Sequence, residues 1–110
     1  MSTTADLDLA ASAMAERAGD VAKLLKTIGN ERRLLVLCTL VGLGEASAGT
    51  LGTAVGLSQS AMSQHLAVMR EEGLVSTRRD GTTIFYAIAD PKLAVLMDTL
   101  HQLYCSPHSA

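Results

Sequence analysis

The chain has 110 residues, of which 48% are hydrophobic and 18% charged, and its formal net charge is −2. This length suits one domain, and the hydrophobic fraction excludes a disordered or low-complexity chain. Aromatic residues make up only 3%, which argues against a base-stacking platform for single-stranded nucleic acid. Acidic and basic residues are equal in number between positions 31 and 92, so the charge of that segment permits DNA binding without arguing for it.

Two helices are predicted in the first part of the chain. Residues 7–28 place hydrophobic side chains three and four positions apart, which is the period of an amphipathic helix. Gly19 is a point where this helix can break or bend. Gly29 and Asn30 end it, and a second helix follows with an apolar stripe made of Leu34, Leu37, Cys38 and Val41.

Two shorter helices follow, joined by a tight turn. Ser47 is predicted to cap the third helix and Gly56 to end it, and Ser58 caps a fourth helix that stops at Gly73. The inward face of the fourth helix is expected to consist of Met62, Leu66 and Met69. Two short helices around a glycine-containing turn have the spacing of a helix-turn-helix.

After Gly73 the hydrophobic period changes from about 3.6 residues to about 2, which predicts two strands. In residues 75–79 and 84–88 the side chains alternate with the period of a strand. Asp80-Gly81 between these segments favours the type I′ turn of a β-hairpin. A last helix begins with Asp90 as its cap and Pro91 at its first position. Its apolar face comprises Leu93, Leu96, Met97, Leu100, Leu103 and Tyr104.

The predicted fold is mainly α-helical with a two-stranded β-wing. Its order of helix, helix, helix-turn-helix, wing and helix is that of a winged helix-turn-helix with extra helices at both ends. Such terminal helices commonly form a homodimer interface, and a twofold dimer presents two reading helices to one palindromic DNA site. Residues 1–110 are expected to form a single DNA-binding domain, in which 1–19 are the N-terminal part of the first helix, which can fray, and 106–110 are a flexible tail.

The fourth helix is the predicted reading helix. With its hydrophobic residues turned inward, its outer face carries four polar side chains: Gln59, Ser60, Ser63 and Gln64. An amide pairs with adenine in the major groove through two hydrogen bonds, and short hydroxyl side chains let the helix approach the bases closely. A polar face can also be merely solvated, but the helix-turn-helix and wing favour DNA contact. His65 lies at the edge of the buried stripe and is interpreted as a packing residue.

Two basic residues, Arg78 and Arg79, precede the predicted turn of the wing. A basic hairpin beside a reading helix suits contact with DNA phosphates or with the minor groove. The alternative is a solvated hairpin whose arginines protect a sheet edge.

Residues 24–104 resemble the ArsR/SmtB family of small bacterial winged-helix repressors. The resemblance is carried by the segments LLKTIGNERRLLVLCTL and GLSQSAMSQHLAVMREEGLVSTRRDGTTIFYAI and by the final helix. It implies a homodimer that represses its own operon and leaves the DNA when an inducer binds.

The metal-binding patterns of that family are not met. Its thiolate site needs Cys-x-Cys in the third helix, and residues 45–52 contain no cysteine. Its zinc site needs Asp-x-His, whereas Asp98 and His101 are three positions apart and His108 stands alone. We therefore expect no metal and no cofactor, and keep a metal-responsive repressor as an alternative.

The two cysteines, Cys38 in the second helix and Cys105 at the end of the last, resemble those of the persulfide-sensing BigR/SqrR branch of the family. In that branch two thiols at corresponding places become joined by a disulfide or polysulfide bridge, which implies reactive sulfur species as the inducer. A protonated His101, one turn before Cys105, would favour its thiolate, whereas the C-terminal end of the helix dipole opposes it. The alternative is a redox-insensitive regulator with two structural cysteines.

The sequence thus predicts a cytoplasmic, sequence-specific repressor that binds double-stranded DNA and is switched by bridging of Cys38 and Cys105. No export signal is visible, and no apolar run is long enough to span a bilayer. An oxidoreductase is disfavoured because the chain has no Cys-x-x-Cys, no glycine-rich phosphate loop and no carboxylate cluster. A winged helix that binds protein instead of DNA is the remaining alternative.

Overall fold

The computed structural model describes the backbone of residues 4–105 and the side chains of residues 11–105. The predicted tail, residues 106–110, lies outside this range. The chain divides into two compact units, one ending at Asn30 and the other beginning at Glu31.

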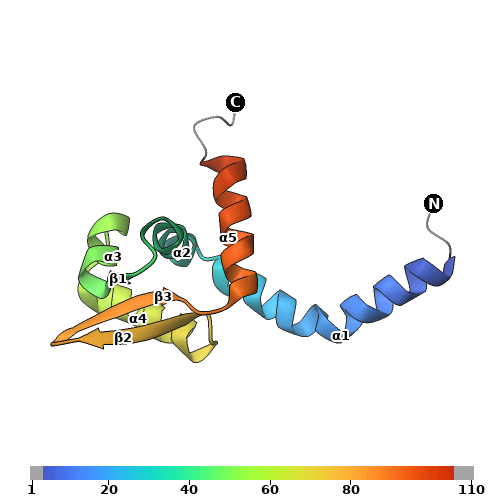
Figure 1. Cartoon of the computed structure of the whole chain (residues 1–110), viewed down its shortest axis with the longest axis horizontal. Helices are drawn as coiled ribbons and strands as arrows, with labels where there is room; N and C mark the ends of the chain where they lie inside the picture. Colours follow the sequence, from blue (N-terminus) through green and yellow to red (C-terminus); the bar gives the residue numbers. More distant parts are fainter. Residues whose placement is uncertain (1–3, 106–110) are drawn as a thin grey trace. The chain divides into compact units, whose positions relative to one another are not determined.

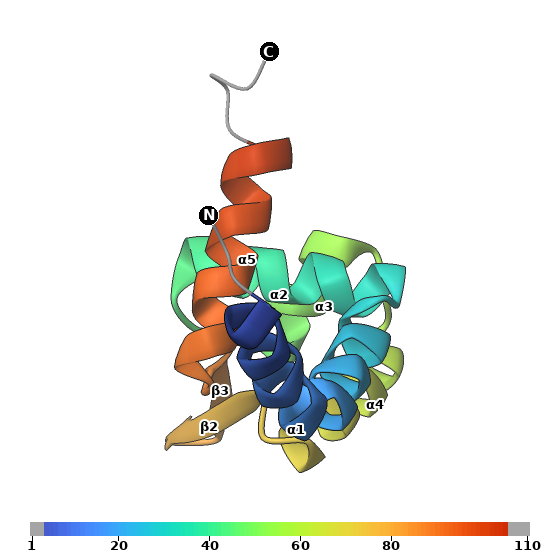
Figure 2. The same cartoon turned by 90° about the vertical axis from the view of Figure 1, so that its right-hand side faces the viewer.

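The first unit is a single helix, α1 (Thr4–Ile28), which is drawn in blue in Figures 1 and 2. It continues through Gly19, so the break that the sequence allowed at this position does not occur. One glycine inside a helix costs only about 1 kcal/mol relative to alanine. The residues on both sides of Gly19 are therefore sufficient to carry the helix across it.

The second unit follows the predicted order of helices and strands (Figure 1). In chain order it contains α2 (Glu31–Leu43), β1 (Ala46–Ser47), α3 (Ala48–Val55), α4 (Gln59–Glu71), β2 (Val75–Asp80), β3 (Thr83–Ile88) and α5 (Pro91–Tyr104). The winged helix-turn-helix is confirmed, with α3 and α4 as the helix-turn-helix and β2 with β3 as the wing. Strand β1 was not predicted: it pairs antiparallel with β3 and gives a three-stranded sheet in the order β1-β3-β2. Two residues are too few to produce a periodic hydrophobic signal.

Three helices of this unit begin at the predicted caps. In each case the side-chain oxygen of the cap accepts a hydrogen bond from a backbone N–H of the first turn: Ser47 from Thr50, Ser58 from Ala61 and Asp90 from Lys92. These bonds satisfy N–H groups that have no partner inside the helix. Local capping chemistry therefore determines where α3, α4 and α5 start.

The core of the second unit is formed by residues from its four helices. The largest fully buried side chains are Val36, Leu37, Leu40, Leu51, Met62, Leu66, Met69, Leu93 and Met97. The predicted inward face of α4 is confirmed in full. In α2 the predicted stripe is partly wrong, because Val36 and Leu40 are buried whereas Cys38 is only half-buried. Every residue from 34 to 38 is hydrophobic, so periodicity alone could not select the buried face.

The turn of the wing differs from the predicted type. Asp80 pairs with Thr83, which makes Gly81 and Thr82 the two central residues. Gly81 has a positive φ of 63°, and Thr82 does not have a positive φ. A type I′ turn needs a positive φ at both central residues, whereas a type II′ turn needs it only at the first, where glycine is favoured. The β-branched Thr82 thus excludes the predicted type I′ geometry.

The turn between α3 and α4 depends on a close approach at Gly52. The backbone N–H of Leu57 donates to the carbonyl of Gly52 at 2.8 Å. A Cβ on Gly52 would lie 2.7 Å from the carbonyl oxygen of Leu57, a backbone atom that cannot move aside as a side chain does. Only glycine fits here without moving the turn that places α4.

We expect Gly52→Ala to lower the free energy of unfolding by about 1–3 kcal/mol, the usual cost of overpacking a buried position. Thermal or denaturant unfolding followed by circular dichroism measures this change. The matched control is Gly49→Ala in the same helix, where the nearest atom to the new Cβ is the Ser47 Oγ at 4.0 Å. That control should unfold at or above the wild-type temperature. Equal destabilisation of both variants would contradict the steric argument.

Candidate nucleic-acid interface

The outer face of α4 carries the four predicted reading residues. Gln59, Ser60, Ser63 and Gln64 are all exposed, while the opposite face of the helix is buried in the core. Within the described part of the chain, none of the four side chains has a hydrogen-bond or ion-pair partner. Their donors and acceptors are therefore available to a ligand.

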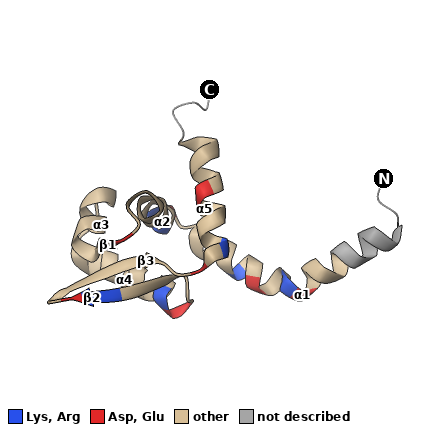
Figure 3. Ribbon diagram, viewed as in Figure 1, with Lys and Arg blue, Asp and Glu red and all other residues tan. Residues whose placement is uncertain are grey.

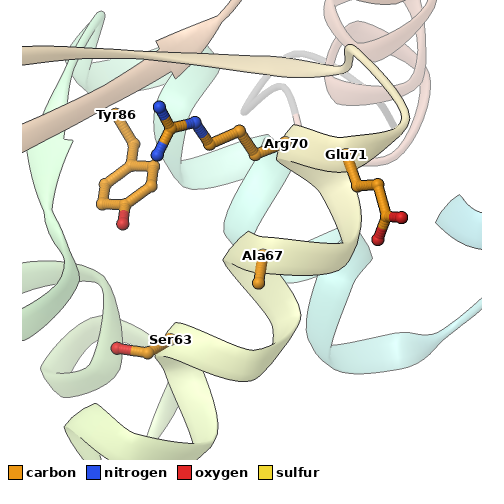
Figure 4. Close-up of a pocket in the computed structure, with 5 residues that line it drawn as sticks. All are labelled: Ser63, Ala67, Arg70, Glu71 and Tyr86. Atoms are coloured by element: carbon orange, nitrogen blue, oxygen red, sulfur yellow. The ribbon is translucent and has the colours of Figure 1, made fainter.

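Two hollows lie between α4 and the wing. The first has a volume of about 380 Å³ and is lined by Ser63, Ala67, Arg70, Glu71 and Tyr86, as drawn in Figure 4. The second, of about 360 Å³, is lined by residues of α4, of the start of α3 and of the wing: Ser47, Ala48, Gly49, Gln59, Ser63, Thr82, Thr83, Ile84 and Tyr86. Ser63 and Tyr86 line both hollows. The reading face of α4 and the wing therefore form one grooved surface.

The two wing arginines lie on opposite faces of the sheet. In the register of the hairpin, Arg79 is opposite Ile84 and Arg78 is opposite Phe85. Because side chains alternate along a strand, Arg79 shares the face of Ile84, which lines the second hollow. Arg78 lies on the other face, where it forms a two-pronged ion pair with Glu45 and lies 4.8 Å from the centre of the Phe85 ring.

The position of Arg79 therefore suits contact with DNA beside α4. Arg78 instead ties the wing to Glu45, the residue that leads into β1. Figure 3 shows the basic residues of β2, followed by an acidic residue at its end. DNA contact by either arginine stays a prediction.

The tie between Glu45 and Arg78 predicts a pH dependence. The hydrogen bond from Arg78, together with its charge, holds the pKa of the Glu45 carboxyl below its usual value. When folding lowers the pKa of a carboxyl, its charged form stabilises the fold at pH values above its pKa in the unfolded chain. This contribution is lost as the pH falls through the lower pKa that the group has in the folded protein. In an NMR titration we expect the Glu45 carboxyl to titrate at lower pH in the wild type than in Arg78→Gln. The same titration midpoint in both proteins would show that the ion pair does not form in solution.

Cys38 lies in α2 and Cys105 caps the end of α5, and these two helices pack against each other. Both are free thiols: Cys38 is half-buried in α2, and Cys105 is exposed at the end of α5. Burial raises the pKa of Cys38, and the charge of Cys105 raises it further. The packing of α2 against α5 therefore puts two thiols that are far apart in the sequence on neighbouring helices.

Residues 30–77, from just before α2 into β2, match the arsR family of bacterial regulatory proteins. The chain is also 48% identical over 82 residues to the transcriptional activator HlyU of Vibrio cholerae, an alignment that covers 74% of this chain and 75% of HlyU. The chain belongs to the ArsR family. Its resemblance to that family, inferred from the sequence, is thereby confirmed.

Further similarities also cover most of the chain. The biofilm growth-associated repressor of Xylella fastidiosa is 44% identical over 93 residues, which cover 84% of this chain and 81% of the repressor. The solved structure of reduced HlyU from V. cholerae has a TM-score of 0.80 and 43% identity, over 84% of this chain and 97% of HlyU. A homodimeric winged helix-turn-helix DNA-binding domain from Mycobacterium bovis has a TM-score of 0.70 and 31% identity, over 86% of this chain and 91% of that domain.

Membership of the ArsR family makes the chain a DNA-binding transcriptional regulator and not an enzyme. None of the helices in the described part combines the length and apolar character that a membrane span needs. Among the described residues, no three His, Cys, Asp or Glu side chains are grouped so as to hold a metal ion. Asp98 accepts a hydrogen bond from Gln102 at 3.0 Å, and His108 lies outside the described residues.

Among the residues of the grooved surface that the sequence did not single out are Arg70 and Tyr86. Arg70 follows Ser63 by two helical turns, so the helical period could have placed it on the reading face. Tyr86 has no such signal, because only the packing of β3 beside α4 brings it to the groove. His65, interpreted as a packing residue, is half-buried, and its Nδ1 accepts a hydrogen bond from the Arg33 Nε of α2 at 3.3 Å.

Proposed function

We propose that this ArsR-family protein is a homodimeric repressor that binds a palindromic operator in double-stranded DNA. The supporting observation is the outer face of α4, where four exposed polar side chains lack partners within the described part of the chain. Of these, Gln59 and Ser63 also line the hollows beside the wing, and Ser60 and Gln64 do not. The residues proposed to read the major groove are Gln59, Ser60, Ser63 and Gln64, with Arg78 and Arg79 supporting from the wing. Amide and hydroxyl groups on a helix are suited to base edges, and arginines on a hairpin to phosphates.

The proposed dimer is formed through the terminal helices. On α5, Val95 is 68% exposed, Leu103 is 61% exposed and Tyr104 is 80% exposed. Exposed hydrophobic side chains on one helix are suited to an interface in which a second copy of the chain buries them. The relative from M. bovis is described as homodimeric. Light scattering on the purified protein should give the mass of two chains.

The proposed switch is a covalent bridge between Cys38 and Cys105, formed by reactive sulfur species. The support for it is the packing of α2, which carries Cys38, against α5, whose C-cap is Cys105, and the different surroundings of the two thiols. Cys105 is exposed and meets a small oxidant first, whereas Cys38 is half-buried and reacts second. A structure of HlyU, a relative, is described as that of the reduced protein.

The reaction balances with a low-molecular-weight persulfide as the oxidant. The Cys105 thiolate attacks the terminal sulfur of the persulfide and becomes a protein persulfide, while the small thiol leaves. The Cys38 thiolate then attacks the Cys105 Sγ and displaces hydrogen sulfide, which leaves a disulfide. The two protein thiols lose two electrons and two protons, and the transferred sulfur is reduced to sulfide. A second equivalent of persulfide can leave one additional sulfur in the bridge, which spans a longer gap than the narrow geometry of a disulfide allows.

The bridge is proposed to weaken DNA binding through the dimer. It joins α2 to α5, and α5 carries the exposed residues of the proposed interface. Two reading helices must lie one turn of DNA apart, about 34–36 Å, to bind both half-sites of an operator. A shift of α5 changes that separation and lowers the affinity.

The test is the binding of the protein to the DNA upstream of its own gene, first reduced and then after treatment with a persulfide. We expect tight binding by the reduced dimer and loss of binding after treatment. Binding that persulfide leaves unchanged would indicate a redox-insensitive regulator with structural cysteines. Absence of any DNA binding would favour a winged helix that binds protein.

Activation is a second candidate, because the relative HlyU is named a transcriptional activator. Both candidates use the same DNA contacts and differ in the effect on transcription. A reporter fused to the upstream DNA distinguishes them: deletion of the gene raises expression for a repressor and lowers it for an activator.

A further inference from the structure

The C-terminal half of the reading helix carries a basic residue, Arg70, that is suited to a contact other than base reading. In the first hollow the guanidinium of Arg70 reaches toward the ring of Tyr86, and the Tyr86 hydroxyl points toward the side of α4 that carries Ser63 (Figure 4). The hollow thus places one cation beside the hydroxyl-bearing ring of Tyr86, with Ser63 two turns away along α4. Glu71 also lines it, but its carboxylate points away along the opposite side of α4 (Figure 4).

The charge of Arg70 is available to a ligand. Arg70 is exposed, and its side chain has no hydrogen-bond or ion-pair partner among the residues that the structure describes. The contrast is Arg78, whose guanidinium is occupied by the Glu45 carboxylate. Arg70 therefore offers the grooved surface a positive charge that no described carboxylate neutralises.

We propose that the hollow between Arg70 and Tyr86 holds a phosphate of the DNA backbone. A guanidinium with a neighbouring hydroxyl group is a donor set suited to phosphate oxygens. This inference rests on the DNA binding of the proposed function and assigns to Arg70 and Tyr86 a role separate from base reading.

The geometry of the helix supports a phosphate over a base. Arg70 lies on the same face as Ser63, two turns further along, which is a rise of about 11 Å. The major groove of DNA is about 12 Å wide. When Ser63 is at the base edges, Arg70 lies at the border of the groove, where the phosphates of one strand run.

The phosphate contact has a consequence that base reading lacks. A phosphate carries no sequence information, so the contact raises affinity for every duplex alike. It also releases a condensed counterion, which makes binding depend on salt. Salt dependence on two DNA sequences therefore separates the two roles.

The experiment measures the affinity of the full-length wild type, Arg70→Gln and Arg70→Lys by fluorescence anisotropy over a series of salt concentrations. The probes are the upstream duplex and a scrambled duplex of the same length. For Arg70→Gln we expect affinity to fall by about 10-fold on both duplexes. The slope of log affinity against log salt should become shallower by about 0.9 for each phosphate that the variant no longer neutralises. Arg70→Lys keeps the charge and should restore the slope.

Two further variants sharpen the result. Tyr86→Phe removes a neutral donor, so it should lower the affinity for both duplexes by a smaller factor than Arg70→Gln does, without changing the slope of log affinity against log salt. Lys92→Gln removes one exposed charge of α5 outside both hollows and should change neither affinity by more than about two-fold, since an isolated surface charge acts weakly at a distance.

Three outcomes would overturn the inference. If Arg70→Gln lowers the affinity for the upstream duplex only, Arg70 reads a base. If it leaves affinity and slope unchanged while the wild type binds, the hollow lies outside the interface and the proposed function stands. If the wild type binds neither duplex, both the inference and the proposed function fail.

Discussion

A variant carrying both Ser63→Ala and Gln64→Ala is expected to lose about 100-fold or more of its preference for the operator over a scrambled duplex. Each well-placed pairing of a side chain with a base contributes about 1–3 kcal/mol of discrimination. The proposed dimer presents the two residues twice, once on each reading helix. Removal of four such groups is therefore a larger change than any substitution of a phosphate contact.

The fold should tolerate this double substitution. Both side chains are exposed and have no partner within the described part of the chain, so their truncation leaves no buried group unsatisfied. Alanine also has the highest intrinsic helix propensity. The thermal unfolding midpoint should equal or exceed that of the wild type, which separates loss of reading from loss of folding.

Anisotropy titrations with the operator and the scrambled duplex measure the preference directly. The control is Ser76→Ala, which removes an exposed hydroxyl from the face of the wing that carries Arg78. It should leave the preference unchanged. Retention of full operator preference by the double variant would show that α4 does not read the bases with these residues.

The parts of the fold that follow from local chemistry could be predicted from the sequence. The caps Ser47, Ser58 and Asp90 set the starts of three helices through hydrogen bonds to their own first turns. The face of α4 was also predictable, since its hydrophobic residues alternate with polar ones at the helical period. The buried face of α2 was not, because five consecutive hydrophobic residues satisfy every phase of that period.

The candidate site was predictable only where one element determines it. The polar face of α4 follows from the helical period alone. The ion pair of Arg78 with Glu45 depends on β1, whose two residues give no signal until they pair with β3. The hollow between Arg70 and Tyr86 likewise requires the wing to lie beside α4, which no local pattern encodes.

Replacement of either cysteine by serine is expected to abolish the response to persulfide. In the wild type we expect treatment to lower operator affinity by roughly 5–150-fold, the range of typical coupling between two sites. Cys38→Ser and Cys105→Ser should bind the operator as tightly as the reduced wild type, before and after treatment. Serine is the matched control for shape, because it replaces sulfur by oxygen and cannot form the bridge.

The two variants should differ in the products that they accumulate. In Cys38→Ser the exposed Cys105 can still take up sulfur, but no second thiol displaces it, so intact-mass spectrometry should show a persistent persulfide. In Cys105→Ser the half-buried Cys38 should remain largely a thiol, because burial limits access to it. The wild type should lose the mass of two hydrogen atoms as the disulfide forms.

The rate of bridge closure should rise with pH. Burial raises the pKa of Cys38, so its thiolate, the attacking form in the second step, is scarce at neutral pH. While the Cys105 persulfide keeps the proton with which its outer sulfur leaves as HS−, each pH unit below the pKa of Cys38 changes the thiolate fraction, and with it the rate, by about 10-fold. Quenched-flow mass spectrometry on the wild type measures the decay of the Cys105 persulfide into the bridged form. A decay rate that does not vary with pH would show that attack by Cys38 is not the rate-limiting step. Loss of operator binding by persulfide-treated Cys38→Ser would show that modification of Cys105 alone, without the bridge, is the switch.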